Sequence, residues 1–358
     1  MTDGFDPSAL RQEWKRPADP RPIVIVGAGG IVSDAHMPAY RKAGFEVAGI
    51  YDIAAENAQK TAAKWEIPRV LENLEQVAAE AASGAVIDMA TPPGAIQEVL
   101  AALPEGATVL IQKPMGTDLE DARGIRGLCR DRNLTAAVNF QLRFSPMMLA
   151  VRDAVDRDLL GDIADLEVHL SLNTPWHLFP FLKSLDRVEI AVHSIHYLDL
   201  IRSFLGEPSG VYARTVGHPE SDGLKQTRTS AILDYGSQKR CCLSINHNFR
   251  RGPNFQAAHF RFDGLKGTAV VKLGLLLNYP EGEPDEVWIA TDSDDWRQVP
   301  LSGGWFPDAF IGTMSNLQRF AAGEDETLVT AVEDAYRTMA LVEACYESNA
   351  SGATPIPD

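Results

Sequence analysis

The sequence predicts an α/β protein of two domains. The first is an N-terminal doubly wound parallel sheet of the Rossmann type, and the second is a C-terminal α+β domain with a large, open, mainly antiparallel sheet. Short apolar runs alternate with helix-like segments up to about residue 140, the first run leads into a glycine-rich turn, and strand-like runs dominate the second half. A chain of 358 residues is long enough for two domains.

The first 140 residues have the rhythm of repeated βαβ units. Short continuous apolar runs that alternate with helical segments indicate a parallel sheet that is covered on both faces. The apolar runs lie at residues 23–26, 47–50, 85–89, 109–111 and 136–138, and the helical segments among them lie at 54–64, 74–82, 96–103 and 119–132.

After about residue 144 the pattern changes to strand-like runs joined by short turns. Asp234-Tyr235-Gly236-Ser237 is typical of a hairpin turn, and Gly206-Glu207-Pro208 is typical of a helix end. The helices are too few to cover both faces of the sheet, so an exposed apolar face predicts a homodimer or homotetramer formed through the C-terminal sheet. Strands are expected at 163–172, 211–216, 227–235, 239–246, 257–262, 269–272 and 286–291, and helices at 147–160, 188–205, 309–322 and 328–348.

Composition and charge argue against several classes of protein. Asp and Glu (49) outnumber Lys and Arg (33), and the net charge of −16 disfavours binding to nucleic acid or a membrane surface. The sequence has no apolar stretch of transmembrane length and no signal-peptide pattern at its start. Its four cysteines have neither a disulfide framework nor metal-site spacing. We therefore expect a cytoplasmic protein with reduced cysteines and no bound metal.

A glycine-rich turn follows the apolar run at 23–26. Gly27 permits a tight turn, Gly29 lets backbone N–H groups approach a pyrophosphate, and the next helix offers its N-terminus to the same negative charge. The turn departs from the strict Gly-x-Gly-x-x-Gly motif, because Val32 stands at the third glycine position. The residues expected to contact a dinucleotide here are Gly27, Gly29, Gly30 and Ile31.

An acidic residue, Asp52, ends the second apolar run. A carboxylate at this place accepts hydrogen bonds from a ribose diol. A role as a turn or cap residue before the helix at 54–64 is the alternative. Ile53, and no basic residue, follows it. A 2′-phosphate would meet a carboxylate without a basic partner, so the sequence favours NAD over NADP.

Five motifs occur in a defined order and spacing. They are the turn at 27–31 with Asp52, Ala90-Thr91-Pro92-Pro93, Gln112-Lys113-Pro114, the segment 139–146, and His196-x-x-Asp199. In this register the chain resembles the glucose–fructose oxidoreductase, inositol dehydrogenase and rhizopine-catabolism family (Gfo/Idh/MocA) over about residues 21–352. The resemblance implies a Rossmann domain, a second domain with a large open sheet that forms dimers or tetramers, and nicotinamide-dependent oxidation or reduction of sugars, cyclitols or related polyols.

Lys113 is the first catalytic candidate. It directly follows the apolar run at 109–111, at the carboxyl end of a parallel strand, where ligands bind in open α/β sheets. The resemblance aligns it with the lysine of the family's Glu-Lys-Pro motif and implies contact with both cofactor and substrate. It also implies that Thr91 and Pro92 lie near the nicotinamide. Gln112 replaces the glutamate, and the loss of that negative charge favours a neutral lysine.

The second catalytic candidate is a histidine on the predicted helix at 188–205. The resemblance aligns His196 with the family's histidine, but Val192 stands where the family has an aspartate four residues earlier. A second register, Glu189-x-x-x-His193, restores an acid and a histidine at that spacing. His193 and His196 are neighbours on the helix surface. Both therefore remain candidates for proton transfer and substrate binding.

Four further side chains are expected to bind substrate. Arg143 lies where the first domain leads into the second, and Trp176 and His177 offer a stacking wall for a sugar. Asp308 begins a helix and offers an acceptor for a hydroxyl. Packing of the tryptophan and a helix N-terminal role of the aspartate are the structural alternatives.

Together these features predict an NAD-dependent dehydrogenase that oxidises a secondary alcohol of a sugar, cyclitol or related polyol. Lys113 and His196 would handle the hydroxyl proton while hydride passes to the nicotinamide. Two alternatives stay open: an NAD-dependent redox-elimination glycosidase on the same scaffold, and a non-catalytic NAD-binding regulatory protein. The expected domains are an arm at 1–20, an NAD-binding domain at 21–142, and a substrate-binding and oligomerisation domain at 143–358.

Overall fold

The computed structural model describes residues 5–178, 180–221, 223–279 and 281–357. The chain divides into two compact units, and each is assembled from separate segments of the sequence. None of the described helices is long and apolar enough to cross a membrane. The parallel-sheet unit consists of Glu13–Ser145 and Phe306–Met339, and the antiparallel-sheet unit consists of Met1–Gln12, Pro146–Trp305 and Ala340–Asp358.

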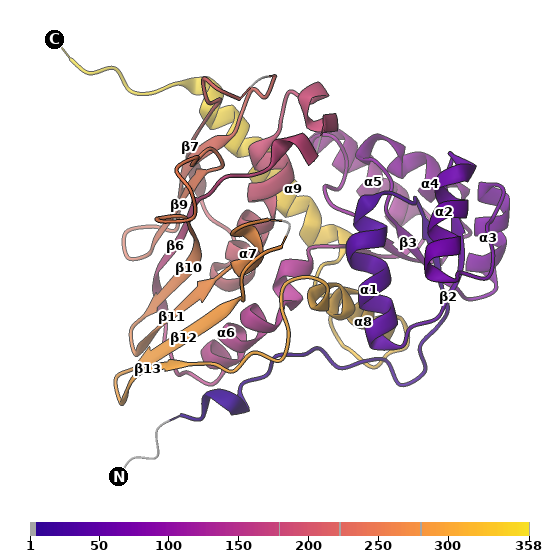
Figure 1. Ribbon diagram of the computed structural model, residues 1–358, viewed down its shortest axis with the longest axis horizontal. Coiled ribbons are helices and arrows are strands. Elements are labelled where there is room, and N and C mark those ends of the chain that lie inside the picture. Colours follow the sequence, from indigo (N-terminus) through magenta and orange to yellow (C-terminus); the bar gives the residue numbers. More distant parts are fainter. Residues whose placement is uncertain (1–4, 179, 222, 280, 358) are drawn as a thin grey trace. The chain divides into compact units, whose positions relative to one another are not determined.

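The parallel-sheet unit is built on five parallel strands in the order β2-β1-β3-β4-β5. Figure 1 shows helices of this unit around the sheet, of which β2 and β3 are labelled. Every residue of β1, β3 and β4 is buried, as expected for a sheet with helices on both faces. The predicted Rossmann-type sheet is thereby confirmed. Its elements are β1 (Ile23–Val26), α1 (Met37–Ala43), β2 (Val47–Tyr51), α2 (Ala55–Trp65), α3 (Leu74–Ala82), β3 (Val86–Met89), α4 (Ile96–Ala102), β4 (Thr108–Ile111), α5 (Leu119–Asp131) and β5 (Thr135–Val138).

Helix α8 (Asp308–Ala321) also belongs to the parallel-sheet unit. Its side chains Phe310, Met314 and Leu317 are buried in the same hydrophobic cluster as Ile23 of β1. The sequence had placed this helix in a continuous C-terminal domain. Its apolar periodicity predicts a buried face but does not reveal which sheet that face covers.

The antiparallel-sheet unit holds eight strands in the order β13-β12-β11-β10-β6-β9-β8-β7. Neighbouring strands are antiparallel except β6 and β9, which run parallel, so the predicted mainly antiparallel sheet is confirmed. Strand β13 (Asp294–Gln298) was missed, because its sequence Asp-Asp-Trp-Arg-Gln has no apolar alternation. The other strands are β6 (Ile163–Ser171), β7 (Gly210–Val216), β8 (Arg228–Asp234), β9 (Arg240–Asn246), β10 (Ala257–Gly264), β11 (Gly267–Lys272) and β12 (Glu286–Thr291).

The remaining elements complete the two units. Helices α6 (Pro146–Asp156) and α7 (Ile195–Leu205) pack against strands of the eight-stranded sheet. Helix α9 (Val332–Ser351) begins in the parallel-sheet unit and continues in the other one. Short 3₁₀ turns lie at Pro7–Ala9, Pro93–Ala95, Gln141–Phe144, Trp176–Leu178, Pro180–Ser184 and Gly274–Leu276.

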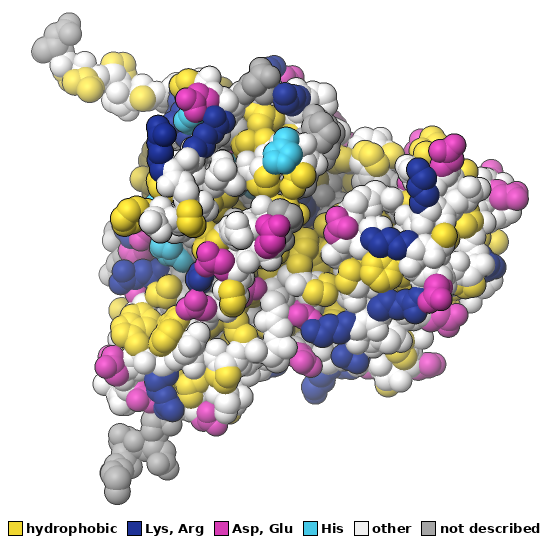
Figure 2. Space-filling model, viewed as in Figure 1, with side chains coloured by type: hydrophobic (Ala, Val, Ile, Leu, Met, Phe, Trp, Pro, Cys, Tyr) yellow, Lys and Arg dark blue, Asp and Glu magenta, His cyan; other side chains and the backbone are white. Residues whose placement is uncertain are grey.

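The outer face of the eight-stranded sheet is mixed: exposed apolar side chains lie there among charged and polar ones, so the uniformly apolar face expected from the sequence is not present. Side chains alternate between the two faces of a strand, and the buried residues of β8 and β9 alternate with exposed ones. Tyr212 and Ile232, which are cross-strand partners, remain 69% and 54% exposed, and Trp288 remains 37% exposed. Figure 2 shows hydrophobic side chains among charged ones on the part of the chain that carries this sheet.

The predicted helix at 188–205 has two parts. Residues Glu189–Ser194 form a π-helical turn, and α7 continues from Ile195 and ends before Gly206, whose φ is +79°. A second π-helical turn, Val32–His36, follows the glycine-rich turn. Such turns are rare in proteins and are frequent at functional sites. Sequence periodicity does not distinguish them from α-helix, which is why one continuous helix was expected.

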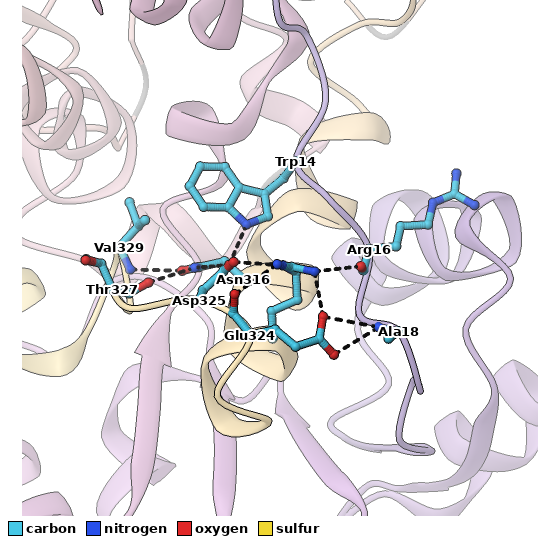
Figure 3. A network of polar contacts seen from close by, with 9 residues as sticks. Trp14, Arg16, Ala18, Asn316, Glu324, Asp325, Thr327 and Val329 are labelled. Carbon is cyan, nitrogen blue, oxygen red and sulfur yellow. Dashed lines mark hydrogen bonds and ion pairs between the residues drawn. The ribbon is translucent and has the colours of Figure 1, made fainter.

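The residues after Gln12 in the N-terminal arm are bound to the end of α8 and the loop after it (Figure 3). Nε1 of Trp14 donates to Asp325 at 2.9 Å, and the guanidinium of Arg319 donates to Asp325, Glu324 and the carbonyl of Arg16. Burial opposes ionisation of Asp325, but hydrogen bonds from Trp14, Asn316 and Arg319 outweigh it and lower its pKa. The described part of the arm is therefore a fixed element of its own chain.

Replacing Trp14 should destabilise the protein in two steps. Trp14→Phe loses the indole hydrogen bond and should lower the free energy of unfolding by about 1 kcal/mol. Trp14→Ala also loses the edge-to-face contact with Phe144, whose ring centroid lies 5.1 Å away, and should cost about 2–3 kcal/mol. Urea unfolding followed by circular dichroism measures both. Lys15→Ala, at an exposed position of the arm, is the control, and equal stability of all four proteins would contradict the expectation.

Candidate functional site

The glycine-rich turn has the backbone that the sequence predicted. Gly27 has a φ of +102°, and a Cβ atom there would lie 2.5 Å from the carbonyl oxygen of Ala90. No larger residue fits this close approach of two strand ends. At Gly29 a Cβ atom would meet nothing within 4 Å, and the helix begins immediately after it. The turn therefore presents backbone N–H groups beside open space at a helix start, as an anion site requires.

Asp52 holds the turn in place from the end of β2. Its carboxylate accepts the N–H of Ala28 at 2.7 Å and the N–H of Ala54 at 2.8 Å. The turn role and the ligand role weighed from the sequence are therefore compatible, because a carboxylate has about four lone-pair sites and these bonds use two. Ile53 beside it is 93% exposed.

Thr91 offers an independent test of whether a cofactor fits here. Its Oγ1 is buried and has no hydrogen-bond partner among the described residues. Buried hydroxyls are normally satisfied by a protein group, water or ligand. Thr91 and Pro92 follow β3, next to the strand that leads into the glycine-rich turn. The residues at the ends of β1, β2 and β3 thus fit a dinucleotide.

Lys113 follows β4 at the same edge of the parallel sheet, one residue after Gln112. Burial lowers the pKa of Lys113 from its ordinary value to about 8. Gln112, in the place of the family's glutamate, accepts a hydrogen bond from Asn139 at 3.0 Å, and Asn139 in turn accepts one from Thr313 at 2.9 Å. The amide of Gln112 therefore joins a neutral, partly buried network directly before Lys113 in the chain.

Two of the predicted substrate ligands take part in ion pairs of the parallel-sheet unit. The guanidinium of Arg143 is buried and donates to Asp334 at 2.6 Å and to the carbonyl of Val329 at 3.2 Å. Asp308 is the first residue of α8, as expected, and pairs with Lys42 at 2.6 Å. These contacts fix both side chains in the fold, and their roles as substrate ligands stay predictions.

The antiparallel-sheet unit brings a second set of predicted residues together. Glu189 is fully buried, and its Oε1 accepts a hydrogen bond from Ser194 at 2.8 Å and lies 3.3 Å from Nε2 of His247. On the other side of that ring, Nδ1 of His247 lies 2.7 Å from Oγ1 of Thr174. The partly buried ring of His193 lies 4.7 Å from the ring of His247, centroid to centroid.

Aromatic rings surround these histidines. The ring centroid of Trp176 lies 5.5 Å from that of His193 and 5.4 Å from that of His247. Its Nε1 is buried without a hydrogen-bond partner among the described residues. His196 is 8% exposed and meets Trp305 edge to face at 5.9 Å. His177, by contrast, is exposed. Trp176 is therefore a wall of the histidine cluster, and the proposed role of His177 in substrate binding remains a prediction.

Val192 occupies an apolar environment. It packs against a small hydrophobic cluster that contains Leu182, Val188 and Leu224 together with Trp176. The position at which the family has an aspartate is thus apolar here. The buried carboxylate beside the histidines His193 and His247 belongs to Glu189 instead.

Sequence reasoning missed His247, Thr174 and Trp305. His247 follows β9 with the same parity as the buried residues Cys241 and Ile245, so the alternation continued by one residue would have turned it inward. For the other two residues the sequence carries no comparable signal, because they lie in irregular segments.

Comparison with known proteins identifies the family. Residues 21–140 match the model of the Gfo/Idh/MocA oxidoreductase family with an NAD-binding Rossmann fold, and residues 190–357 match the model of its C-terminal alpha/beta domain. The chain belongs to this family. It is an oxidoreductase with an NAD-binding domain, and the predicted family, enzyme class and cofactor are confirmed.

Individual relatives are distant. The chain is 24% identical to a D-apiose dehydrogenase of Rhizobium rhizogenes, over 68% of this chain and 71% of that protein. It is 24% identical to inositol 2-dehydrogenase 2 of Saccharopolyspora erythraea, over 93% and 94%. The crystal structure of an oxidoreductase from Agrobacterium radiobacter in complex with NAD+, L-tartaric acid and magnesium has a TM-score of 0.76 at 20% identity, over 94% of this chain and 98% of that chain, and shows the shared fold.

Proposed function

We propose that the protein is an NAD-dependent dehydrogenase that oxidises a secondary alcohol of a sugar, cyclitol or related polyol. The observation that carries the proposal is Lys113, a partly buried lysine with a pKa of about 8 at the carboxyl edge of a dinucleotide-binding sheet. Such a group changes its charge near neutral pH, as the transfer of a hydroxyl proton requires. Relatives named for apiose and inositol support a polyhydroxylated substrate.

We assign the cofactor to the turn Gly27–Ile31, Asp52, Thr91 and Pro92. The backbone N–H groups of the turn would bind the pyrophosphate, Asp52 would accept from ribose hydroxyls, and Oγ1 of Thr91 would gain the partner that it lacks among the described residues. When bound, the nicotinamide supplies the hydride acceptor. The protein's own contribution is to orient the alcohol and to move its proton.

We assign the handling of the hydroxyl proton to Lys113 and His196. As an ammonium ion, Lys113 would stabilise the alkoxide that develops as the C–H bond breaks, and His196 is the better proton acceptor near neutral pH. Trp176 offers an apolar ring to a sugar face. Arg143, His177, His193 and Asp308 are proposed as further substrate contacts.

A panel of aldoses, cyclitols and anhydrosugars, assayed for NADH at 340 nm, tests the function. Steady NADH formation with one of them is the expected result. Conversion of a glycoside without net NADH would instead indicate the redox-elimination glycosidase. NAD binding in calorimetry without turnover on any member of the panel would favour the regulatory protein.

Cofactor choice should depend on the charge of Asp52. We expect NAD to bind much more tightly than NADP, because the carboxylate accepts from a ribose hydroxyl and repels a phosphate. Asp52→Asn and Asp52→Ala should weaken NAD binding. They should also reduce the ratio of the NADP Kd to the NAD Kd by about tenfold or more, which corresponds to about 1.4 kcal/mol. Calorimetric Kd values for both cofactors measure this, with Glu56→Gln on the exposed face of α2 as the control. Equal Kd values in the unmodified protein would contradict the assignment.

We also infer a homodimer or homotetramer that forms through the outer face of the eight-stranded sheet. The cross-strand pair Tyr212 and Ile232 at one edge of the sheet and Trp288 near the other edge support it, since exposed large apolar side chains are frequent at interfaces. Light scattering should give a multiple of 39.1 kDa for the unmodified chain. Ile232→Asp combined with Trp288→Asp should shift it to the monomer mass, and Ile356→Asp, at an exposed isoleucine elsewhere, should not. A monomer in every case would contradict the inference.

We place the protein in the cytoplasm. Cys129, Cys241 and Cys345 are buried free thiols, and burial raises the pKa of Cys129 and Cys345 to about 12. Reduced, unreactive thiols agree with a reducing compartment.

A further inference from the structure

The pair of Glu189 and His247 places a carboxylate deep inside the antiparallel-sheet unit. Both side chains are at most 2% exposed, and Oε2 of Glu189 has no hydrogen-bond partner among the described residues. A buried carboxylate is costly unless a proton or a counter-ion neutralises it. His247, 3.3 Å from Oε1, is the basic side chain that the structure places against it.

The other ionisable groups near Glu189 are neutral at neutral pH or already paired. Burial, together with the negative charge of Glu189, raises the pKa of Tyr197, Cys345 and Tyr346, that of Cys345 to about 12. Arg187, which lies over the ring of Tyr346, forms two hydrogen bonds with Glu343 at 2.6 and 2.8 Å. These groups do not supply the counter-charge, so it falls to the histidines.

The surroundings of His247 suit an imidazolium ion. Such a ring donates from both nitrogens, and here Nε2 faces the Glu189 carboxylate while Nδ1 faces the hydroxyl oxygen of Thr174 at 2.7 Å. Both N–H groups of the charged ring are therefore satisfied, and the salt bridge has the hydrogen bonds that a buried pair needs.

A charge on His247 has a direct consequence for His193. The two ring centroids are 4.7 Å apart, with Trp176 against both rings. Two imidazolium ions at this distance repel each other, and the burial of His247 weakens the screening of that repulsion by water. Once His247 is protonated, its charge therefore opposes protonation of His193, and the partly exposed ring of His193 stays neutral.

We propose that His247 is a positioning residue, which carries the positive charge of this cluster opposite Glu189 and thereby keeps His193 neutral and able to accept a proton. The proposal rests on the dehydrogenase function, in which the hydroxyl proton of the substrate leaves through the histidines of this unit. In this proposal the carboxylate of the cluster comes from Glu189, since Val192 stands where the family has an aspartate. The partner of Glu189 is His247, which lies outside the helix of Glu189.

The decisive experiment follows the histidine rings by ¹⁵N NMR of the histidine-labelled, substrate-free protein. His247→Asn leaves the Glu189 carboxylate as the nearest charge, so the pH at which His193 gains its proton should rise by about one unit or more. Adding Glu189→Gln removes that carboxylate and should reverse most of the rise. His218→Gln, at a ring that accepts the N–H of Glu220 on a loop, is the matched control and should leave His193 unchanged.

Kinetics give the second readout. A limb of kcat against pH that follows the protonation of His193 should move to higher pH in His247→Asn, while a limb that follows His196 and the KM for the sugar should stay as in the unmodified protein. A packing defect alone would lower the rate at every pH and would not be reversed by Glu189→Gln. An unshifted His193 titration in His247→Asn, or a shift that persists in the double variant, overturns the proposal.

Two further outcomes are decisive. His247→Asn could fail to fold because Glu189 is left unpaired. In that case ¹⁵N NMR of the unmodified protein and of Glu189→Gln tests the proposal. At pH 7, His247 should have two protonated ring nitrogens in the unmodified protein and one in Glu189→Gln. A neutral His247 in the unmodified protein overturns the proposal. If the NMR results hold but no sugar or polyol reduces NAD, the charge assignment stands and the dehydrogenase function fails.

Discussion

Replacement of Lys113 by methionine is expected to lower kcat for alcohol oxidation by a factor of about 10²–10⁴, with NAD affinity almost unchanged. This is the usual contribution of a positioned group that handles charge or a proton in the transition state. Methionine keeps the length and apolar stem of the side chain but has no charge. Stopped-flow NADH formation gives the rate, and calorimetry gives the Kd of NAD.

The pH dependence separates the two roles that Lys113 could have. Its pKa of about 8 means that the ammonium ion is lost above that pH. If the cation stabilises the alkoxide while His196 takes the proton, kcat should fall above pH 8. Lys113→Arg, which cannot lose its proton, should keep part of the rate and lack this falling limb. A limb that rises through pH 8 would instead make the neutral amine the base.

Stability provides the control for Lys113→Met. Burial depresses the pKa from 10.5 to about 8, so the unfolded chain holds this proton more tightly than the folded one. The ammonium therefore opposes folding below about pH 8, and stability rises with pH between the two values. Unfolding in urea at pH 7 should show Lys113→Met to be no less stable than the unmodified protein. Full turnover by a folded Lys113→Met on the true substrate would refute the catalytic lysine.

The parallel sheet was predictable because its signals are local. The run at 23–26 and the glycines after it have the composition that a buried strand and a tight turn require, and φ of +102° at Gly27 bears this out. Asp52 was found for the same reason, because a strand end and the residue after it are adjacent in sequence. The contacts of its carboxylate with Ala28, 24 residues away, were not readable, because they depend on strand pairing.

The candidate substrate site was harder to predict, because its contacts are distant in sequence. Glu189 was paired with His193 on the assumption of a regular helix. In the structure, Glu189 lies in a π-helical turn and bonds to His247, 58 residues further on, in another element. The motif match identified His196 but carried no information about Trp305, whose ring lies against it. Local pattern thus located the histidines, and only the fold shows their partners.

Replacement of His196 by alanine is expected to reduce kcat by a similar factor of about 10²–10⁴, because the proposed proton acceptor is removed. His196→Asn should be equally slow, since an amide of comparable size and polarity cannot take the proton. Trp305→Phe keeps an aromatic ring against His196 and should retain most of the rate. Pre-steady-state NADH formation, measured with and without deuterium at the reacting carbon, shows whether the chemical step is affected.

The same experiment on His193 decides between the two registers of the helix. If His196 is the principal acceptor, His193→Ala should slow the reaction less than His196→Ala, and added imidazole should partly restore the rate of His196→Ala alone. Imidazole rescue requires only that the missing group be a proton acceptor at an accessible place. Full turnover by His196→Ala together with loss of activity in His193→Ala would reverse the assignment. In that case His193, held neutral beside the Glu189–His247 pair, would be the base itself.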